Sequence, residues 1–124
     1  MIINFEEITS TLSEEDLKFV WIISHSLSAR DKSNPIKGPE IVSRVNSYIE
    51  AKRADIKTKL TEPKLRKICN YIRSNGIIPL IATSNGYYTS YDKRDVLLQM
   101  KSLQDRADAI TNCIKGMERF IIEG

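Results

Sequence analysis

TEPKLRKICNYIRSNGIIPLIATSNGYY, residues 61–88, carries the signals for a helix, its end and a β-hairpin. Thr61 is a favourable N-cap, because its hydroxyl can accept a hydrogen bond from a free N–H of the first turn. Pro63 falls in that first turn, where its missing N–H costs nothing. Asn75-Gly76 ends the helix, because glycine accepts the left-handed conformation that follows a last turn. The spacing i, i+3, i+4, i+7 predicts one buried face, formed by Leu65, Ile68, Cys69 and Ile72.

Two β-prone runs follow this helix, at residues 77–83 and 87–91. Asn85-Gly86 in the connection favours positive φ, which predicts a type I′ turn or a bulged loop. Pro79 cannot donate to a ladder, so the first strand is expected to be an edge at that point. Alternation places Tyr87 and Tyr91 on one side and Tyr88 on the other, and at least one tyrosine is expected to pack on the core.

Two more helices are expected before residue 61. Ser13 and Asp16 form a near capping box, which predicts a helix to about residue 28 with Trp21 as a core anchor. Pro39 opens a second amphipathic helix. The basic stretch 51–60 either extends this second helix or forms a loop, and residues 1–12 are expected to be an irregular lead-in.

The spacing of the apolar residues changes after residue 92. Apolar residues then alternate at spacings of 4 and 3 without interruption, which is a heptad seam over more than three heptads. A helix of this length extends about 40 Å or more, too far to bury its stripe on a small domain alone. It therefore predicts a homodimer through a coiled coil; the alternative is a helix that folds back on its own core, bending at Gly116. The seam consists of Val96, Met100, Leu103, Ala107, Ile110, Ile114, Met117 and Ile121.

The charge is unevenly distributed along the 124 residues, which carry +3 in total. Residues 1–30 hold two basic and five acidic groups (net −3), residues 31–75 eleven and five (net +6), and residues 76–124 six of each (net 0). A local basic surface indicates a polyanionic partner. The acidic first segment is expected to face away from that surface.

The composition argues against several other classes of protein. No run approaches the ~18 apolar residues of a membrane span, and the acidic N-terminus is not a secretory signal. Cys69 and Cys113 are the only cysteines and are expected to be buried free thiols; the alternative is a disulfide between them. Free thiols indicate the cytoplasm. With one histidine, no CxxC and no phosphate loop, neither a metal site nor a cofactor nor an enzyme is expected.

Several short motifs carry a resemblance over roughly residues 13–120: Pro39-Glu40-Ile41, Arg66-Lys67-Ile68, Tyr71-Ile72-Arg73, Gly86-Tyr87-Tyr88, Ser102-Leu103 and Arg106-Ala107. With the order of the expected elements, they resemble the winged helix-turn-helix DNA-binding superfamily, and in particular small winged-helix proteins of bacteriophages and prophages. The resemblance implies a mainly α fold with a small β-hairpin (α+β). Residues 1–91 would form the winged helix-turn-helix domain, and residues 92–124 a C-terminal helix for self-association.

Binding of double-stranded DNA in a bacterial host cell is the function that the resemblance and the charge pattern predict. The helix at 62–74 would enter the major groove, the 77–91 hairpin would be the wing, and Lys67 and Asn70 would point away from the core. Such a protein would be a transcriptional regulator or a replication accessory factor; the alternative is a protein-interaction or adaptor module with little DNA affinity. The candidate DNA contacts are Lys52, Arg53, Lys57 and Lys59 for phosphates, Lys64, Arg66, Lys67, Asn70, Tyr71 and Arg73 in or beside the major groove, and Asn85 and Tyr87 in the wing.

Overall fold

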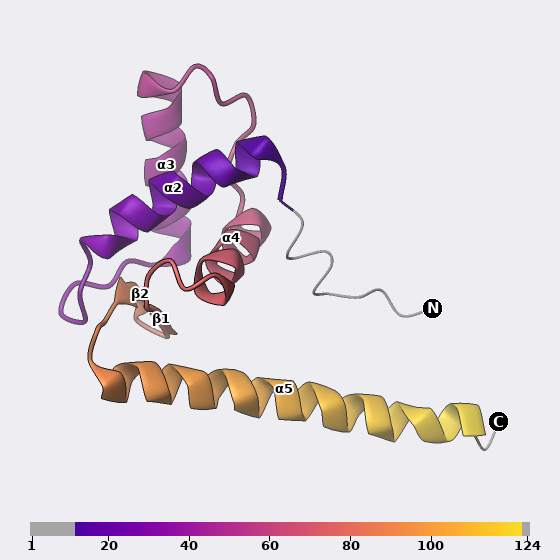
Figure 1. Ribbon diagram of the computed structural model, residues 1–124. Helices are drawn as coiled ribbons and strands as arrows, with labels where there is room; N and C mark the ends of the chain where they lie inside the picture. The colour runs from indigo at the N-terminus through magenta and orange to yellow at the C-terminus, as the bar shows by residue number, and fades with distance from the viewer. Residues whose placement is uncertain (1–11, 123–124) are drawn as a thin grey trace. The chain divides into compact units, whose positions relative to one another are not determined.

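The computed structural model describes residues 12–122 and is mainly helical, with a small two-stranded antiparallel hairpin (Figure 1). In chain order the elements are α2 (Glu14–Ser28), α3 (Gly38–Lys52), α4 (Glu62–Ser74), β1 (Leu80–Thr83), β2 (Gly86–Thr89) and α5 (Lys93–Ile122). The chain divides into two compact units, Met1–Ser90 and Tyr91–Gly124, and each is described by itself. The expected lead-in lies outside the described residues, apart from Leu12.

The capping box before α2 is confirmed. The hydroxyl of Ser13 accepts a hydrogen bond from the backbone N–H of Asp16 at 3.0 Å, and the Asp16 carboxylate accepts one from the backbone N–H of Ser13 at 3.4 Å. Satisfying free N–H groups on the first turn stabilises a helix start. The predicted helix accordingly begins at Glu14 and ends at Ser28.

The prediction that Trp21 anchors the core is wrong, because its side chain is 65% exposed. The buried stripe of α2 is formed by Phe19, Val20, Ile23 and Leu27. At about 100° per residue, Trp21 lies roughly 145° from the middle of that stripe. The helix has more apolar residues than one buried face can hold, and the largest of them is left outside.

The stretch 51–60 is mostly a loop. α3 has Pro39 in its first turn, as predicted, and ends at Lys52, so residues 53–60 form what we call the basic loop. The Asn46 side chain fixes the end of this loop, because it accepts from the N–H of Leu60 at 2.8 Å and donates to the carbonyl of the same residue at 3.0 Å. Ile56 and Leu60 are buried, so the loop is anchored to the core.

The predicted start and end of α4 are both confirmed. The Thr61 hydroxyl accepts from the N–H of Lys64 at 3.3 Å. At the other end Gly76 has φ +60°, its N–H donates to the carbonyl of Arg73 at 3.1 Å, and the N–H of Ile77 reaches the carbonyl of Ile72 at 3.0 Å. This pair of bonds is the Schellman arrangement that glycine favours. The four apolar residues predicted to face inward are buried: Leu65, Ile68, Cys69 and Ile72.

The hairpin is shorter than the two β-prone runs. β1 pairs with β2 in a register that joins Leu80 to Thr89 and Thr83 to Gly86, and Pro79 precedes the ladder. The type I′ turn is wrong, because it needs two residues with positive φ and, among residues 12–122, only glycines have positive φ. Here the positive angle, φ +127°, belongs to Gly86.

A bridge that the sequence did not reveal adds a third backbone segment to the hairpin. The N–H of Ile36 donates to the carbonyl of Tyr87 at 3.0 Å, and the N–H of Tyr87 donates to the carbonyl of Ile36 at 2.7 Å. A Cβ on Gly86 would lie 2.6 Å from the carbonyl carbon and oxygen of Ile36. The close approach of these backbones therefore requires glycine at position 86.

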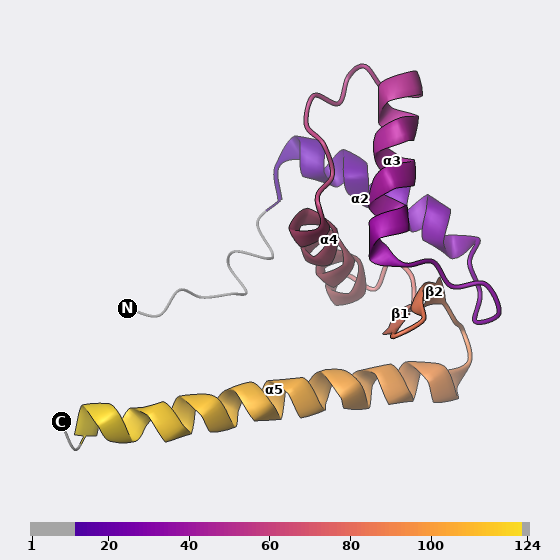
Figure 2. The same ribbon diagram turned by 180° about the vertical axis from the view of Figure 1, so that it is seen from behind.

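The core of the first unit lies between α2, α3 and α4, with the hairpin against them. α4 packs against α2, α3 and β1, and α2 also packs against β2. In both views the hairpin lies next to the end of α4 and the start of α3 (Figures 1 and 2). Thr89 fixes β2 to the end of α2, since its hydroxyl donates to the carbonyl of Leu27 at 2.9 Å and its N–H to that of Arg30 at 3.0 Å.

α5 is one uninterrupted helix of 30 residues, so the bend at Gly116 that belonged to the alternative, a helix folded back on its own core, does not occur. The Asp92 carboxylate accepts from the N–H of Arg94 at 2.9 Å at its start. Cys113 is exposed on this helix, and therefore the expectation of a buried thiol is confirmed for Cys69 and wrong for Cys113. None of the helices within residues 12–122 combines the length and apolar character that crossing a membrane requires.

Candidate nucleic-acid interface

The exposed side of α4 presents an arginine and an amide on a rigid helix. We call this side the α4 outer face; it consists of Pro63, Arg66, Asn70 and Ser74, which are all exposed. It lies opposite the buried stripe that begins at Leu65. Within residues 12–122, the side chains of Arg66 and Asn70 make no hydrogen bond or ion pair. Both therefore remain available to an outside partner.

The hairpin borders one flank of this face. The guanidinium Nε of Arg73 donates to the carbonyl of Leu80 at 3.2 Å, which ties α4 to β1. Tyr87 is half-buried against the core, and the charges of Arg66 and Arg73 both act on its hydroxyl. Burial, opposed by these cations, raises the pKa of Tyr87. The neighbouring Tyr88 is buried, as expected for at least one tyrosine.

Cys69 lies beneath this flank and has no reactive character. Burial is the main reason that the pKa of its thiol rises to about 11, although Arg73 and Tyr87 oppose the shift. A thiol with a raised pKa is a poor nucleophile, because the thiolate is the reactive form. Cys69 is therefore a packing residue in this site.

The acidic first turn of α2 borders the opposite flank, which corrects two expectations. The ammonium groups of Lys64 and Lys67 lie 3.3 and 3.9 Å from the two carboxylate oxygens of Asp16, a buried residue. The Lys64 ammonium also lies 5.3 Å from the ring centroid of Phe19. The acidic segment does not face away from the basic residues, and Lys67 does not point outward. Long lysine stems let the charged ends reach a carboxylate on the adjacent helix.

Arg53, at the start of the basic loop, also pairs with an acidic residue. Its guanidinium makes two hydrogen bonds to the Asp55 carboxylate, at 2.9 and 3.0 Å, and the ammonium of Lys18 lies 3.2 Å from the same group. The hydrogen bonds from Arg53 and Lys18 hold the pKa of Asp55 well below its usual range. Arg53 is therefore engaged within the unit.

The middle of the basic loop is fixed by Glu15 from α2. One of its carboxylate oxygens accepts from the N–H of Lys57 at 2.9 Å and from the N–H and hydroxyl of Thr58, each at 2.6 Å. The Thr58 hydroxyl is the main reason that the pKa of Glu15 is lowered. The Lys57 ammonium donates to the carbonyl of Ala54 at 2.7 Å.

The other predicted contacts have mixed surroundings. Lys52 and Lys59 are exposed and make no hydrogen bond or ion pair within the described residues. Tyr71 packs partly against the core, and Asn85 is exposed at the hairpin tip, where its N–H donates to the Thr83 hydroxyl at 3.2 Å. Of the twelve residues, Arg66, Asn70, Lys52, Lys59 and Asn85 keep their side chains most open to a partner.

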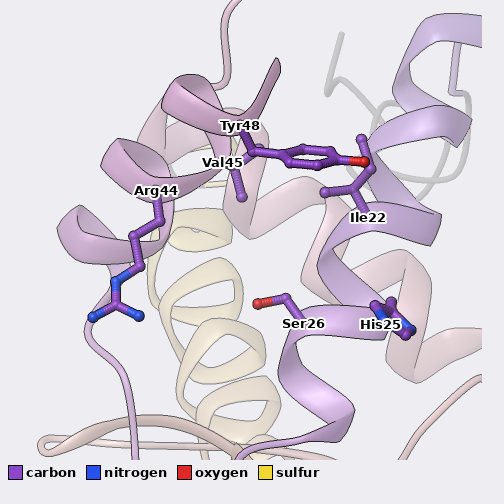
Figure 3. Close-up of a pocket in the computed structure, with 6 residues that line it drawn as sticks. All are labelled: Ile22, His25, Ser26, Arg44, Val45 and Tyr48. Atoms are coloured by element: carbon purple, nitrogen blue, oxygen red, sulfur yellow. The ribbon is translucent and has the colours of Figure 1, made fainter. Parts of the chain in front are cut away.

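An apolar groove that sequence reasoning missed lies between α2 and α3. It has a volume of about 460 Å³, and Figure 3 shows the Tyr48 ring extending from α3 towards Ile22 of α2. Leu17 and Trp21 on α2 and Tyr48 on α3 are large exposed apolar residues of the same two helices. The available signal was Ile22, an apolar residue of α2 that lies outside the buried stripe and lines the groove. The groove is lined by Ile22, His25, Ser26, Arg44, Val45 and Tyr48.

Neither a metal-binding cluster within the described residues nor a known relative identifies the function of this site. Among residues 12–122, no three His, Cys, Asp or Glu side chains gather so that they could hold a metal ion. Family models, curated proteins and solved structures were all compared with the chain, and none matches it. The site itself must therefore indicate the function.

Proposed function

We propose that this chain binds double-stranded DNA as a winged helix-turn-helix protein, with α4 in the major groove and the β1–β2 hairpin as the wing. The order of elements supports this proposal: α2, a single bridge at Ile36, α3, α4 and then the hairpin. The bridge joins Ile36 to Tyr87, so a third backbone segment lies beside the proposed wing. α2 and α3 back α4 from the core side, so α4 can present its outer face as a rigid element.

The observation that carries the proposal is the pair of open side chains on the α4 outer face. Arg66 and Asn70 are four residues apart, so they lie on the same side of the helix. Arginine binds the O6 and N7 atoms of guanine with two hydrogen bonds, and asparagine pairs in the same way with adenine. We assign base contacts to these two residues.

Phosphate contacts fall to the cations that the unit does not use internally. Lys52 and Lys59 serve this role, since both are exposed and make no ion pair within residues 12–122. Asn85 at the hairpin tip would contact the backbone from the wing. Lys64 and Lys67 share the Asp16 carboxylate and contribute less than their number suggests.

Selection of a preferred site from random duplexes, followed by fluorescence anisotropy, tests this assignment. Arg66→Ala and Asn70→Ala should each weaken binding to the selected site by about 1–3 kcal/mol and relax the preference at one base pair. Lys115→Ala is the matched control for Arg66→Ala, because it removes one exposed positive charge from α5. Unchanged affinity and preference in both α4 variants would refute the assignment.

Protein docking is the second candidate function, and the exposed side chains of Leu17, Trp21 and Tyr48 favour it. These side chains belong to the two helices that line the apolar groove, and contiguous exposed apolar surface marks interaction sites. A docking module predicts that Trp21→Ala changes partner binding, and that duplex DNA is not bound even at low salt.

A further inference from the structure

One side of α5 is a continuous apolar surface, which we call the α5 seam and which comprises the eight residues predicted from the heptad spacing. Its members lie on a single unbroken helix of 30 residues. The large side chains are widely exposed: Met100 by 58%, Ile110 by 63%, Ile114 by 45%, Met117 by 69% and Ile121 by 83%. Phe120 beside the seam is 74% exposed. A contiguous apolar surface of this kind indicates a binding partner.

On the other side of α5, polar side chains bond to one another within the helix. The ammonium of Lys101 donates to Asp105 at 3.3 and 3.4 Å, and the Gln104 amide donates to Asp108 at 2.8 Å. These i, i+4 pairs stand on the solvent side of an amphipathic helix. Asn112 and Gly116 also fall outside the seam positions. The seam is therefore the one apolar stripe that continues along the helix, and Leu97, Leu98 and Ile122 are further exposed apolar residues outside it.

The spacing of that stripe specifies its partner. Alternation of 4 and 3 gives a period of 3.5, which stays aligned with a second supercoiled helix but drifts around a straight helix packed on a globular surface. The described seam spans more than three heptads without a polar interruption. We infer that the seam pairs with the α5 seam of a second copy of this chain, forming a two-stranded coiled coil.

A second copy suits the surface better than an unrelated helix does. Two identical seams bring the same apolar residues to one interface, and a two-fold pairing closes after two chains. The seam holds eight knob positions, and Ala107 at its middle permits close approach of the two helices. This pairing does not depend on DNA binding, so either proposal can fail alone.

Sedimentation equilibrium of the full chain, supported by light scattering, tests the pairing. The parent should have twice the chain mass of 14.2 kDa at micromolar concentration. Ile114→Asp places a charge in the seam on both helices and should raise the dissociation constant by about 100-fold, since a buried unpaired carboxylate is strongly unfavourable. Asn112→Asp is the matched control, because it adds the same charge on the opposite side of α5, and it should remain a dimer.

Circular dichroism establishes whether each variant keeps its helices. A second variant, Ile110→Asp, repeats the test at a neighbouring seam position with 63% exposure. A monomeric parent would overturn the inference, and so would dimers that persist in both seam variants. A parent of three or four chains would overturn the two-stranded arrangement, and apolar side chains at the flank such as Phe120 would then belong to the interface.

Discussion

Asp16 is the residue on which the charged contacts between α2 and α4 depend. Its carboxylate accepts from the N–H of Ser13 and lies within 3.3 Å of the Lys64 ammonium and 3.9 Å of the Lys67 ammonium. The residue is only 7% exposed, so solvent screens these interactions less than at the surface. One carboxylate thus stabilises a helix start and withdraws two cations from the surface of α4.

Asp16→Asn should separate these two roles. Asparagine keeps the shape and can still accept at the helix start, but it releases both lysines. We expect unfolding free energy to fall by roughly 1–2 kcal/mol, measured by urea denaturation. Affinity for duplex DNA at low salt should rise, and its salt dependence should steepen by up to about two units, because each freed lysine can neutralise one phosphate.

Glu14→Gln is the matched control for this prediction. It removes the same charge from the same helix turn, but Glu14 is exposed and makes no ion pair within residues 12–122. A change in DNA affinity of equal size in both variants would mean that net charge alone is responsible. Weaker DNA binding by Asp16→Asn, with its fold intact, would contradict the release of the lysines.

At the level of the elements, the hairpin depends on the close crossing of Gly86 and Ile36. Gly86→Ala would place a Cβ 2.6 Å from backbone atoms of Ile36, at a φ of +127° that alanine rarely adopts. We expect the free energy of unfolding to fall by about 2 kcal/mol or more. Thermal denaturation monitored by circular dichroism measures this loss. The bridge between Ile36 and Tyr87 should be lost first.

Gly116→Ala gives the opposite expectation within α5. Among the described residues, nothing lies within 4 Å of a Cβ at that position, and the backbone is helical. Alanine should therefore stabilise the helix by about 0.5–1 kcal/mol.

For the prediction at position 86, a Gly86→Ala variant with unchanged stability would show that the crossing at Ile36 is not required.

Elements with local signals were predictable from the sequence, and contacts between distant segments were not. α4 has an N-cap at Thr61 and a glycine stop at Gly76, and its observed ends agree with both. The bridge at Ile36 could not be predicted, because a single pair of residues leaves no repeating pattern in the sequence. The preceding Asn34-Pro35 indicates only a connector. Trp21 was misplaced because hydrophobicity alone does not say which face of an apolar helix meets the core.

In the candidate site, too, local features were predictable from the sequence and contacts between distant segments were not. The outward position of Asn70 follows from helix geometry, and the structure has it exposed; Arg66, expected on a flank of α4, is exposed as well. The pairing of Lys67 with Asp16, like the capping of the basic loop by Glu15, joins residues more than 40 positions apart. Counting charges along the chain cannot reveal such pairs, so it overestimated how many cations remain open.

For the molecule as a whole, ion pairs with acidic residues leave fewer open cations than the net charge of residues 31–75 suggests. The acidic start of α2 neutralises lysines of α4 and fixes the basic loop, so a few open groups, Arg66, Asn70, Lys52 and Lys59, carry the proposed DNA contacts. If two chains also pair through α5, two such surfaces act together. Affinity for a duplex with two half-sites should then exceed affinity for one, as linked binding requires.

Titration of a fluorescent random-sequence duplex with the parent protein, over a range of salt concentrations, tests DNA binding most directly. The two cations assigned to phosphates, Lys52 and Lys59, predict saturable binding. The logarithm of its association constant should fall with the logarithm of the salt concentration at a slope of about −2 per chain, or steeper. Absence of binding at the lowest salt, by protein shown to be folded, would contradict the account. Trp21 and the α2–α3 groove would then be the surface to pursue.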